Sequence, residues 1–207
     1  LDLVHKNVSI LKSIIPEITR RGCEGLLLIV SNPVDILTYA AYRISGFPSS
    51  RVFGSGTVLD SARFRYLLSE HLSVDTESIH AFIIGEHGDS ELAVWSGTNV
   101  AGIPIHDFCE FRGHYRHTDA MEAIYSQVKN SAYDIIDRKG ATYYGIAMAI
   151  GHITESIIRN KNSILPVSSL LTGQYGLKDL YLSIPTIVNR NGAQQPLEIP
   201  LSGQEHL

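Results

Sequence analysis

The feature that most constrains the fold of this chain is the alternation of amphipathic and continuous apolar segments along its N-terminal part. The amphipathic segments carry apolar residues at helical spacing, and the apolar runs between them lack the polar alternation of half-exposed strands. The pattern predicts a helix over residues 4–18, a strand over 26–30, a helix over 35–44 with Asp35 as its N-cap, and a strand over 51–53. Strands that alternate with helices form parallel sheets through right-handed crossovers. We therefore expect an α/β protein that begins with part of a doubly wound parallel sheet.

The remainder of the chain has a different pattern, with long helical segments and strands that alternate in polarity. We expect helices over residues 58–72, 118–138 and 142–159; strands over 79–84, 92–96, 164–171, 180–184 and 197–201; a hairpin turn at Asn191-Gly192; and irregular backbone over 102–115. Asn-Gly between two strand-like runs is a strong hairpin signal. The pattern indicates an α+β arrangement with an antiparallel sheet, and no linker separates it from the first part.

Composition excludes several classes of protein. The chain has 207 residues, of which 44% are hydrophobic and 18% charged, and a net charge of −4. These values are typical of a globular protein and give no support for a nucleic-acid partner. No apolar stretch reaches transmembrane length, and Cys23 and Cys109 lack metal-ligand spacing. We expect a cytoplasmic protein with neither a membrane nor a nucleic-acid partner.

The segment Gly85-Glu86-His87-Gly88-Asp89-Ser90 is the strongest indication of a functional site. It follows an apolar run that reads as a buried strand, and its glycines allow a sharp turn and a close approach by a ligand. A histidine at such a strand end has a pKa suited to proton transfer. A strand-to-loop turn with an incidental polar residue is the simpler interpretation.

Asp60 and Arg63 lie three residues apart at the start of one predicted helix, so their side chains share a face. A surface ion pair that contributes under ~1 kcal/mol is one interpretation. Alternatively, the carboxylate orients an imidazole while the guanidinium binds a substrate carboxylate through two parallel hydrogen bonds. With His87 nearby, those tasks describe a site for a small carboxylic acid.

Three motifs together resemble the NAD-dependent L-lactate dehydrogenases, in order and with compatible spacing. They are Val30-Ser31-Asn32-Pro33-Val34-Asp35, Leu59-Asp60-Ser61-Ala62-Arg63-Phe64-Arg65 and the histidine segment over 85–90. The resemblance implies a Rossmann-type dinucleotide-binding part over residues 1–56 and an α+β substrate domain over 57–207. It also implies reversible hydride transfer between NADH and pyruvate, an oxidoreductase of glycolysis and fermentation that produces lactate, and a homotetramer. Malate and branched-chain 2-hydroxy acid dehydrogenases share the key residues and remain alternatives.

The resemblance also implies roles for the residues around the reacting atoms. His87 is the proton donor to pyruvate and the base in the reverse direction, and Asp60 orients it. Arg63 binds the substrate carboxylate, and Asn32, joined to Pro33 by a cis peptide bond, contacts both substrate and nicotinamide.

Three further residues complete this expected site. Thr142 matches the threonine beside the substrate, although it could equally be a helix N-cap. Ile146 matches the apolar residue against the nicotinamide ring, and Ser31 lies with Asn32 in the cofactor-binding segment.

Arg65 and His80 match residues that bind fructose 1,6-bisphosphate in bacterial members of the family. Binding at a subunit interface would bias the oligomer toward its active form, giving allosteric activation. The alternative is that Arg65 is a solvated surface charge and His80 an ordinary strand residue.

The chain also departs from the family pattern. It has no G-x-G-x-x-G, which holds the cofactor pyrophosphate at a helix N-terminus. In the family alignment, the loop arginine that polarises the carbonyl would precede Leu1, and a last helix would follow Leu207. We therefore expect a fragment that alone binds NADH poorly and turns over little; near-normal turnover would contradict this expectation.

Two other interpretations remain for the site. Glu86, His87 and Asp89 could be metal ligands of a hydrolase, but their spacing does not match known zinc sites and we expect no metal. A truncated subunit that binds a sugar phosphate without catalysis is the second.

Overall fold

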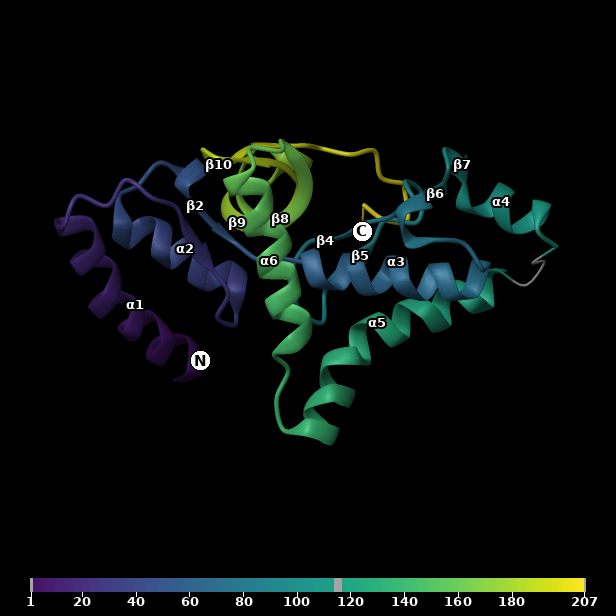
Figure 1. The fold of residues 1–207 in the computed structure, drawn as a ribbon, viewed down its shortest axis with the longest axis horizontal. Helices are drawn as coiled ribbons and strands as arrows, with labels where there is room; N and C mark the ends of the chain where they lie inside the picture. The colour runs from purple at the N-terminus through teal and green to yellow at the C-terminus, as the bar shows by residue number, and fades with distance from the viewer. Residues whose placement is uncertain (1, 114–116, 207) are drawn as a thin grey trace.

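The computed structural model describes residues 2–113 and 117–206. The N-terminal part consists of α1 (Asp2–Arg20), β1 (Leu27–Ile29), α2 (Val34–Ser45) and β2 (Val52–Gly54). β1 pairs with β2 in parallel, as the alternating pattern predicts. The two helices lie side by side in Figure 1, and Ile15 of α1 packs against Ala41 and Val52. The apolar face of α1 and the apolar strand β2 therefore pack into the same core.

The rest of the chain combines helices with antiparallel strands. Its helices are α3 (Val58–Leu72), α4 (Ile105–Phe111), α5 (His117–Lys139) and α6 (Tyr144–Ile158). Its strands are β3 (Ile79–His80), β4 (Ile83–Ile84), β5 (Leu92–Ala93), β6 (Asn99–Val100), β7 (Ile103–Pro104), β8 (Ser163–Thr172), β9 (Lys178–Asn189) and β10 (Gly192–Pro196). Short 3-10 turns cover Ser49–Arg51, Thr76–Ser78 and Gln174–Gly176.

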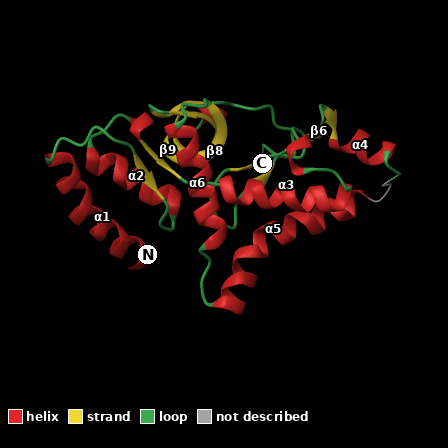
Figure 2. Ribbon diagram, in the orientation of Figure 1, coloured by secondary structure: helices red, strands yellow, loops and turns green. Residues whose placement is uncertain are grey.

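One sheet joins the two parts of the chain. Its five strands follow the order β1-β2-β8-β9-β10, with β2 parallel to β1 and antiparallel to β8. The long β8–β9 pair curls strongly, as Figure 2 shows. Two small antiparallel sheets, β3-β6-β7 and β4-β5, lie near α3, and the end of β4 borders β9 of the large sheet. The parallel β1–β2 pair, which alternates with helices, and the helices and antiparallel strands that follow it confirm the expected α/β class with an α+β second part.

Two apolar clusters hold this arrangement together. In the first, Ile153 of α6 packs with Phe53, Val167 and Val188 of the large sheet, all of them 0% exposed. In the second, one face of α3 packs against α5 and the small sheets; its members include Phe64, Leu68, Leu72, Ile83, Ala93, Met121 and Val128. α3 therefore lies between α5 and the strands, and its position is fixed on two sides (Figure 1).

Polar side chains set the register between α3 and β4. Thr57 Oγ1 donates to the Ile83 carbonyl at 2.6 Å, and the Ile83 amide donates to Ser61 Oγ at 2.9 Å. Thr57 and Ser61 are fully buried, so these bonds satisfy groups that would otherwise be costly to bury. Asp60 lies beside Ser61, and its place relative to the end of β4 follows from this register.

The expected strand over 79–84 is wrong as a single element. The structure has β3 and β4 with separate partners, β6 and β5. Between them, the Ala81 carbonyl accepts a hydrogen bond from Arg65 Nη1 at 3.1 Å. The Arg65 side chain therefore occupies the Ala81 carbonyl, which a continuous strand would use to pair with a neighbouring strand. The strand expected over residues 92–96 is also shorter, because β5 ends at Ala93.

Two more expectations fail near prolines. The strand after the Asn191-Gly192 turn is Gly192–Pro196, and residues 197–201 form none; Pro200 within them has no amide hydrogen to donate to a ladder. The segment 102–115 is not wholly irregular: α4 follows Pro104 and buries Ile105 and Cys109 on one face. Tyr115 lies outside the described residues.

No helix in the described part of the chain is long and apolar enough to cross a membrane.

We predict that Ile153→Ala lowers the free energy of unfolding by about 2–5 kcal/mol, because it opens a cavity in a fully buried cluster. Ile158→Ala on the same helix is the matched control: that side chain is 72% exposed, and its loss should change stability by about 0.5 kcal/mol or less. Urea unfolding followed by circular dichroism measures both. Equal losses would mean that α6 does not pack on the sheet as described.

Candidate active site

The segment Gly85–Ser90 joins β4 to β5 and is anchored at its first residue. Gly85 has a φ of +93°, a conformation that favours glycine. Its amide donates to the Ser183 carbonyl at 2.8 Å, and the Ser183 amide donates to the Gly85 carbonyl at 2.9 Å. This pairing with β9 holds the start of the loop, so His87 follows at a defined place.

The loop presents His87 to Asp60 on α3. Nδ1 of His87 lies 2.6 Å from Asp60 Oδ2, and Arg63 Nη1 lies 3.4 Å from Asp60 Oδ1. Asp60 is 4% exposed, so its charge relies on these two partners. The bond at Nδ1 leaves Nε2 as the ring nitrogen able to face a ligand. The structure thus brings together three residues that the sequence singled out, and the surface-pair interpretation of Asp60 and Arg63 is wrong.

The surroundings of His87 favour its protonated form. Burial lowers the pKa of the imidazole, but the hydrogen bond and charge of Asp60 outweigh that effect, with further help from the charges of Asp35 and Glu91. The net result is a pKa raised above the ordinary value. Such an imidazolium can deliver a proton to a ligand atom at neutral pH.

Asp35 anchors the histidine loop instead of capping a helix. α2 begins at Val34 with Pro33 at the N-cap position, so the predicted capping role is wrong. Asp35 is 7% exposed; its Oδ2 accepts from the His87 amide at 2.9 Å and its Oδ1 accepts from Ser168 Oγ. Burial raises the pKa of Asp35, and the two hydrogen bonds oppose that rise. One carboxyl therefore connects α2, the histidine loop and β8.

Ser31 and Asn32 lie just beyond β1, at the carboxyl end of a parallel strand. Both are exposed, and the Asn32–Pro33 peptide bond is cis, as expected. The Asn32 carbonyl accepts a hydrogen bond from Asn7 Nδ2 of α1 at 2.9 Å. Ligands of open α/β sheets bind beyond this end of the strands.

Thr142 and Ile146 lie near the start of α6, where the turn from α5 projects from the body of the molecule (Figure 1). Tyr143 occupies the N-cap position, so Thr142 does not cap the helix. Ile146 is half-buried against the cluster around Phe53 and Ile153. No hydrogen bond or ion pair among the described residues joins Thr142 to His87, and its expected role remains a prediction.

Glu91 is a residue that the sequence reasoning missed. It lies 6% exposed beside the pair, and ligand atoms of Asp60, His87 and Glu91 all lie within 4.8 Å of one another. Burial raises the pKa of Glu91 to about 7, and the nearby charge of Asp60 adds to the rise. The sequence gives no signal for this position, because a charged residue at a strand start is usually solvated. The 2.6 Å bond between His87 and Asp60 and the charge of Arg63 both disfavour a cation at this cluster.

Arg65 and His80 line a separate cavity of about 260 Å³, together with His152 and Glu77. The Arg65 guanidinium is half-buried, and this burial lowers its pKa. Arg65 and Arg63 project from different sides of α3, toward this cavity and toward Asp60 respectively.

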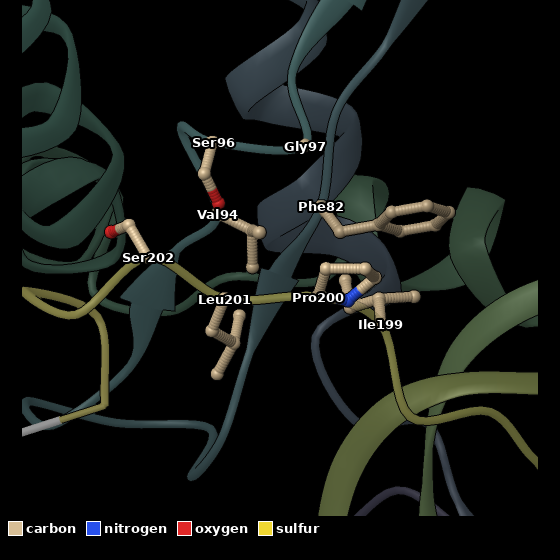
Figure 3. Close-up of a pocket in the computed structure, with 8 residues that line it drawn as sticks. All are labelled: Phe82, Val94, Ser96, Gly97, Ile199, Pro200, Leu201 and Ser202. Atoms are coloured by element: carbon tan, nitrogen blue, oxygen red, sulfur yellow. The ribbon is translucent and has the colours of Figure 1, made fainter.

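A cavity of about 420 Å³ lies at the open end of the β4–β5 pair, opposite the histidine loop. Figure 3 shows Phe82 and Val94 facing a coil formed by Ile199, Pro200, Leu201 and Ser202. None of the predicted site residues lines it, and its lining has no ionisable side chain. It therefore does not offer the chemistry that the histidine site offers.

Comparison with known proteins identifies the family. Residues 1–54 match the lactate/malate dehydrogenase NAD binding domain, and residues 57–206 match the lactate/malate dehydrogenase alpha/beta C-terminal domain. The chain belongs to the lactate/malate dehydrogenase family.

Individual relatives agree in sequence and in structure. L-lactate dehydrogenase 1 of Clostridium acetobutylicum is 54% identical over 99% of this chain and 66% of its own length. L-lactate dehydrogenase of Acetivibrio thermocellus is 55% identical over 99% of this chain and 65% of its own length. A crystal structure of minor L-lactate dehydrogenase from Enterococcus mundtii in the ligands-bound form superposes with a TM-score of 0.94 at 44% identity, covering 99% of this chain and 65% of that one. The chain thus spans about 65% of the length of these relatives.

We predict that Asp35→Ala releases the histidine loop. The methyl group can accept neither hydrogen bond, so the free energy of unfolding should fall by about 1–3 kcal/mol and the His87 amide should exchange faster with deuterium. Ser168→Ala is the matched variant, because it removes one partner of Asp35 and keeps the bond to His87. Equal His87 exchange rates in the two variants would contradict this role of Asp35.

Proposed function

We propose that the protein is an L-lactate dehydrogenase that catalyses reversible hydride transfer between NADH and pyruvate. The observation that carries this proposal is the bond of 2.6 Å between His87 and the buried Asp60, with Arg63 on the same face of α3. This set places a proton source beside a group suited to a carboxylate. The names of the relatives and the coverage of both family models support the same assignment.

In the proposed reaction His87 carries the proton. During pyruvate reduction the imidazolium gives its proton to the carbonyl oxygen, and in lactate oxidation the neutral imidazole takes the proton from the hydroxyl group. Asp60 holds Nδ1 of His87, so Nε2 is the nitrogen that exchanges the proton. The negative charge of Asp60 stabilises the imidazolium. Asp35 holds the backbone amide of His87 through a separate hydrogen bond.

Substrate binding is assigned to polar groups around this histidine. Arg63 binds the substrate carboxylate with its guanidinium, which suits a planar two-oxygen anion. Asn32 and Thr142 complete the proposed contacts to substrate. Fixing the carboxylate in this way aligns the carbonyl with His87 and favours the transition state over free substrate.

The residues present fit the nicotinamide end of NAD. Ser31 and Asn32 offer exposed polar groups at the carboxyl end of β1, and Ile146 offers an apolar contact from α6. When bound, the dinucleotide supplies or accepts the hydride. The sequence contains no glycine-rich motif for the pyrophosphate. We assign residues 1–56 to the dinucleotide-binding domain and 57–207 to the substrate domain.

Malate or branched-chain 2-hydroxy acid dehydrogenase is the alternative activity, because these enzymes also need a histidine, an aspartate and a carboxylate-binding arginine. The relatives named above favour lactate. A cytoplasmic homotetramer acting in fermentation belongs to the same proposal.

We predict that the full-length protein oxidises NADH with pyruvate faster than with oxaloacetate, and that His87→Asn lowers kcat by about 10²–10⁴-fold. Asparagine can keep a bond to Asp60 but cannot transfer the proton, so the Kd for NADH should stay unchanged. Absorbance at the NADH band measures turnover, and His5→Asn on α1, an exposed position, serves as control. A preference for oxaloacetate would move the assignment to malate dehydrogenase.

We infer a second, regulatory function for the cavity that contains Arg65 and His80. An arginine, a histidine and the neighbouring His152 around about 260 Å³ suit a phosphate group. We propose fructose 1,6-bisphosphate as the activator, bound where subunits of the oligomer meet.

We predict that Arg65→Gln and His80→Gln each raise the Kd for fructose 1,6-bisphosphate about tenfold or more, because each removes a charge-assisted contact to phosphate. Basal pyruvate reduction should persist in both. Calorimetry on the full-length protein gives the Kd, and Arg43→Gln on the exposed side of α2 is the control. Unchanged affinity in both variants would exclude this cavity as the site.

A further inference from the structure

Glu91 is a buried carboxyl that the proposed reaction does not use. Its side chain is 6% exposed, and its Oε1 has no hydrogen-bond partner among the described residues. A buried carboxyl oxygen without a hydrogen-bond partner is costly, so the position of Glu91 next to Asp60 and His87 requires an explanation.

The ionisable groups that face Glu91 come from two helices and its own loop. Asp60 and Arg63 of α3, His87 of the loop and Lys129 of α5 all act on its charge. The Tyr125 hydroxyl of α5 donates a hydrogen bond to the Glu91 carbonyl. Burial, and secondly the charge of Glu91, raise the pKa of the Tyr125 phenol to about 12.

The backbone near Glu91 is held firmly. The Glu91 amide donates to the Gly88 carbonyl at 3.2 Å, and Lys129 Nζ donates to the Asp89 carbonyl at 2.8 Å. The Lys129 ammonium therefore bonds to the backbone of the loop and lies 4.9 Å from the centre of the Tyr125 ring. Glu91 is left facing Asp60 and His87, with ligand atoms of the three within 4.8 Å of one another.

We infer that Glu91 is a positioning residue of the His87–Asp60 pair: its buried carboxylate lies against the pair, and its negative charge biases His87 toward the protonated form. The catalytic meaning of this inference rests on the proposed function, because there His87 must arrive protonated to reduce pyruvate. The electrostatic relation itself is independent of any substrate.

The two groups titrate as a coupled pair. Glu91 raises the proton affinity of His87, and His87 lowers that of Glu91, while Asp60 and Asp35 also favour the imidazolium. Because burial places the pKa of Glu91 at about 7, its charge appears over the pH range in which a histidine titrates. As pH falls through that range, Glu91 takes up a proton and its support for the imidazolium fades. The His87 titration should therefore be broader than that of an isolated group.

The test is an NMR titration of His87 in the 207-residue chain, with its ring signal assigned by its loss in His87→Asn. We expect Glu91→Gln to move the His87 midpoint to lower pH and to sharpen the curve. Glu91→Asp keeps the charge and should restore most of the wild-type midpoint. Glu86→Gln is the matched control, because it removes an equal charge one residue from His87 at an exposed position. A Glu91→Gln midpoint equal to that of Glu86→Gln would overturn the inference.

Kinetics on the full-length protein separate this inference from the proposed function. We expect Glu91→Gln to shift the His87-dependent limb of kcat/KM for pyruvate to lower pH. If no pyruvate reduction occurs while the His87 midpoint still moves, the proposed function fails and the inference stands. If pyruvate is reduced but the limb does not move, the inference fails and the function stands.

Discussion

A carboxylate removed from water must be compensated, and Asp60 is the group on which this requirement falls most heavily. Its partners come from separate segments: Arg63 from its own helix and His87 from the loop between β4 and β5. The two can meet only if α3 and β4 keep their register, and the buried hydroxyls of Thr57 and Ser61 set that register through Ile83. The site thus depends on hydrogen bonds made beneath it.

Three carboxyls surround one imidazole, and their environments give them different tasks. Asp60 holds the ring nitrogen, Asp35 holds the backbone amide, and Glu91 makes no hydrogen bond through its Oε1 to any described residue. Asp35 and Glu91 are both shifted toward the neutral form by burial, yet Asp35 accepts two hydrogen bonds that oppose the shift. Asp35 and Glu91 are buried to a similar extent, so they differ in their hydrogen-bond partners rather than in their exposure.

The sequence predicted the features that depend on local pattern. The parallel pairing of β1 and β2, the bounds of α3 and the meeting of Asp60, Arg63 and His87 follow from periodicity and from strand ends. Features set by distant partners could not be predicted. The break between β3 and β4 depends on Arg65 reaching the Ala81 carbonyl, and the role of Asp35 depends on Ser168, far along the chain. Glu91 was missed because burial of a charge leaves no signature in a single sequence.

The segment between the two family matches has a mechanical consequence. Gly54, Ser55, Gly56 and Thr57 are all buried, and a Cβ at Gly56 would lie 2.5 Å from the Ser168 amide. A junction packed so closely against β8 cannot serve as a hinge. The parts of the chain matched by the NAD binding and alpha/beta C-terminal domain models should therefore move as one rigid body, without a hinge at residues 54–57.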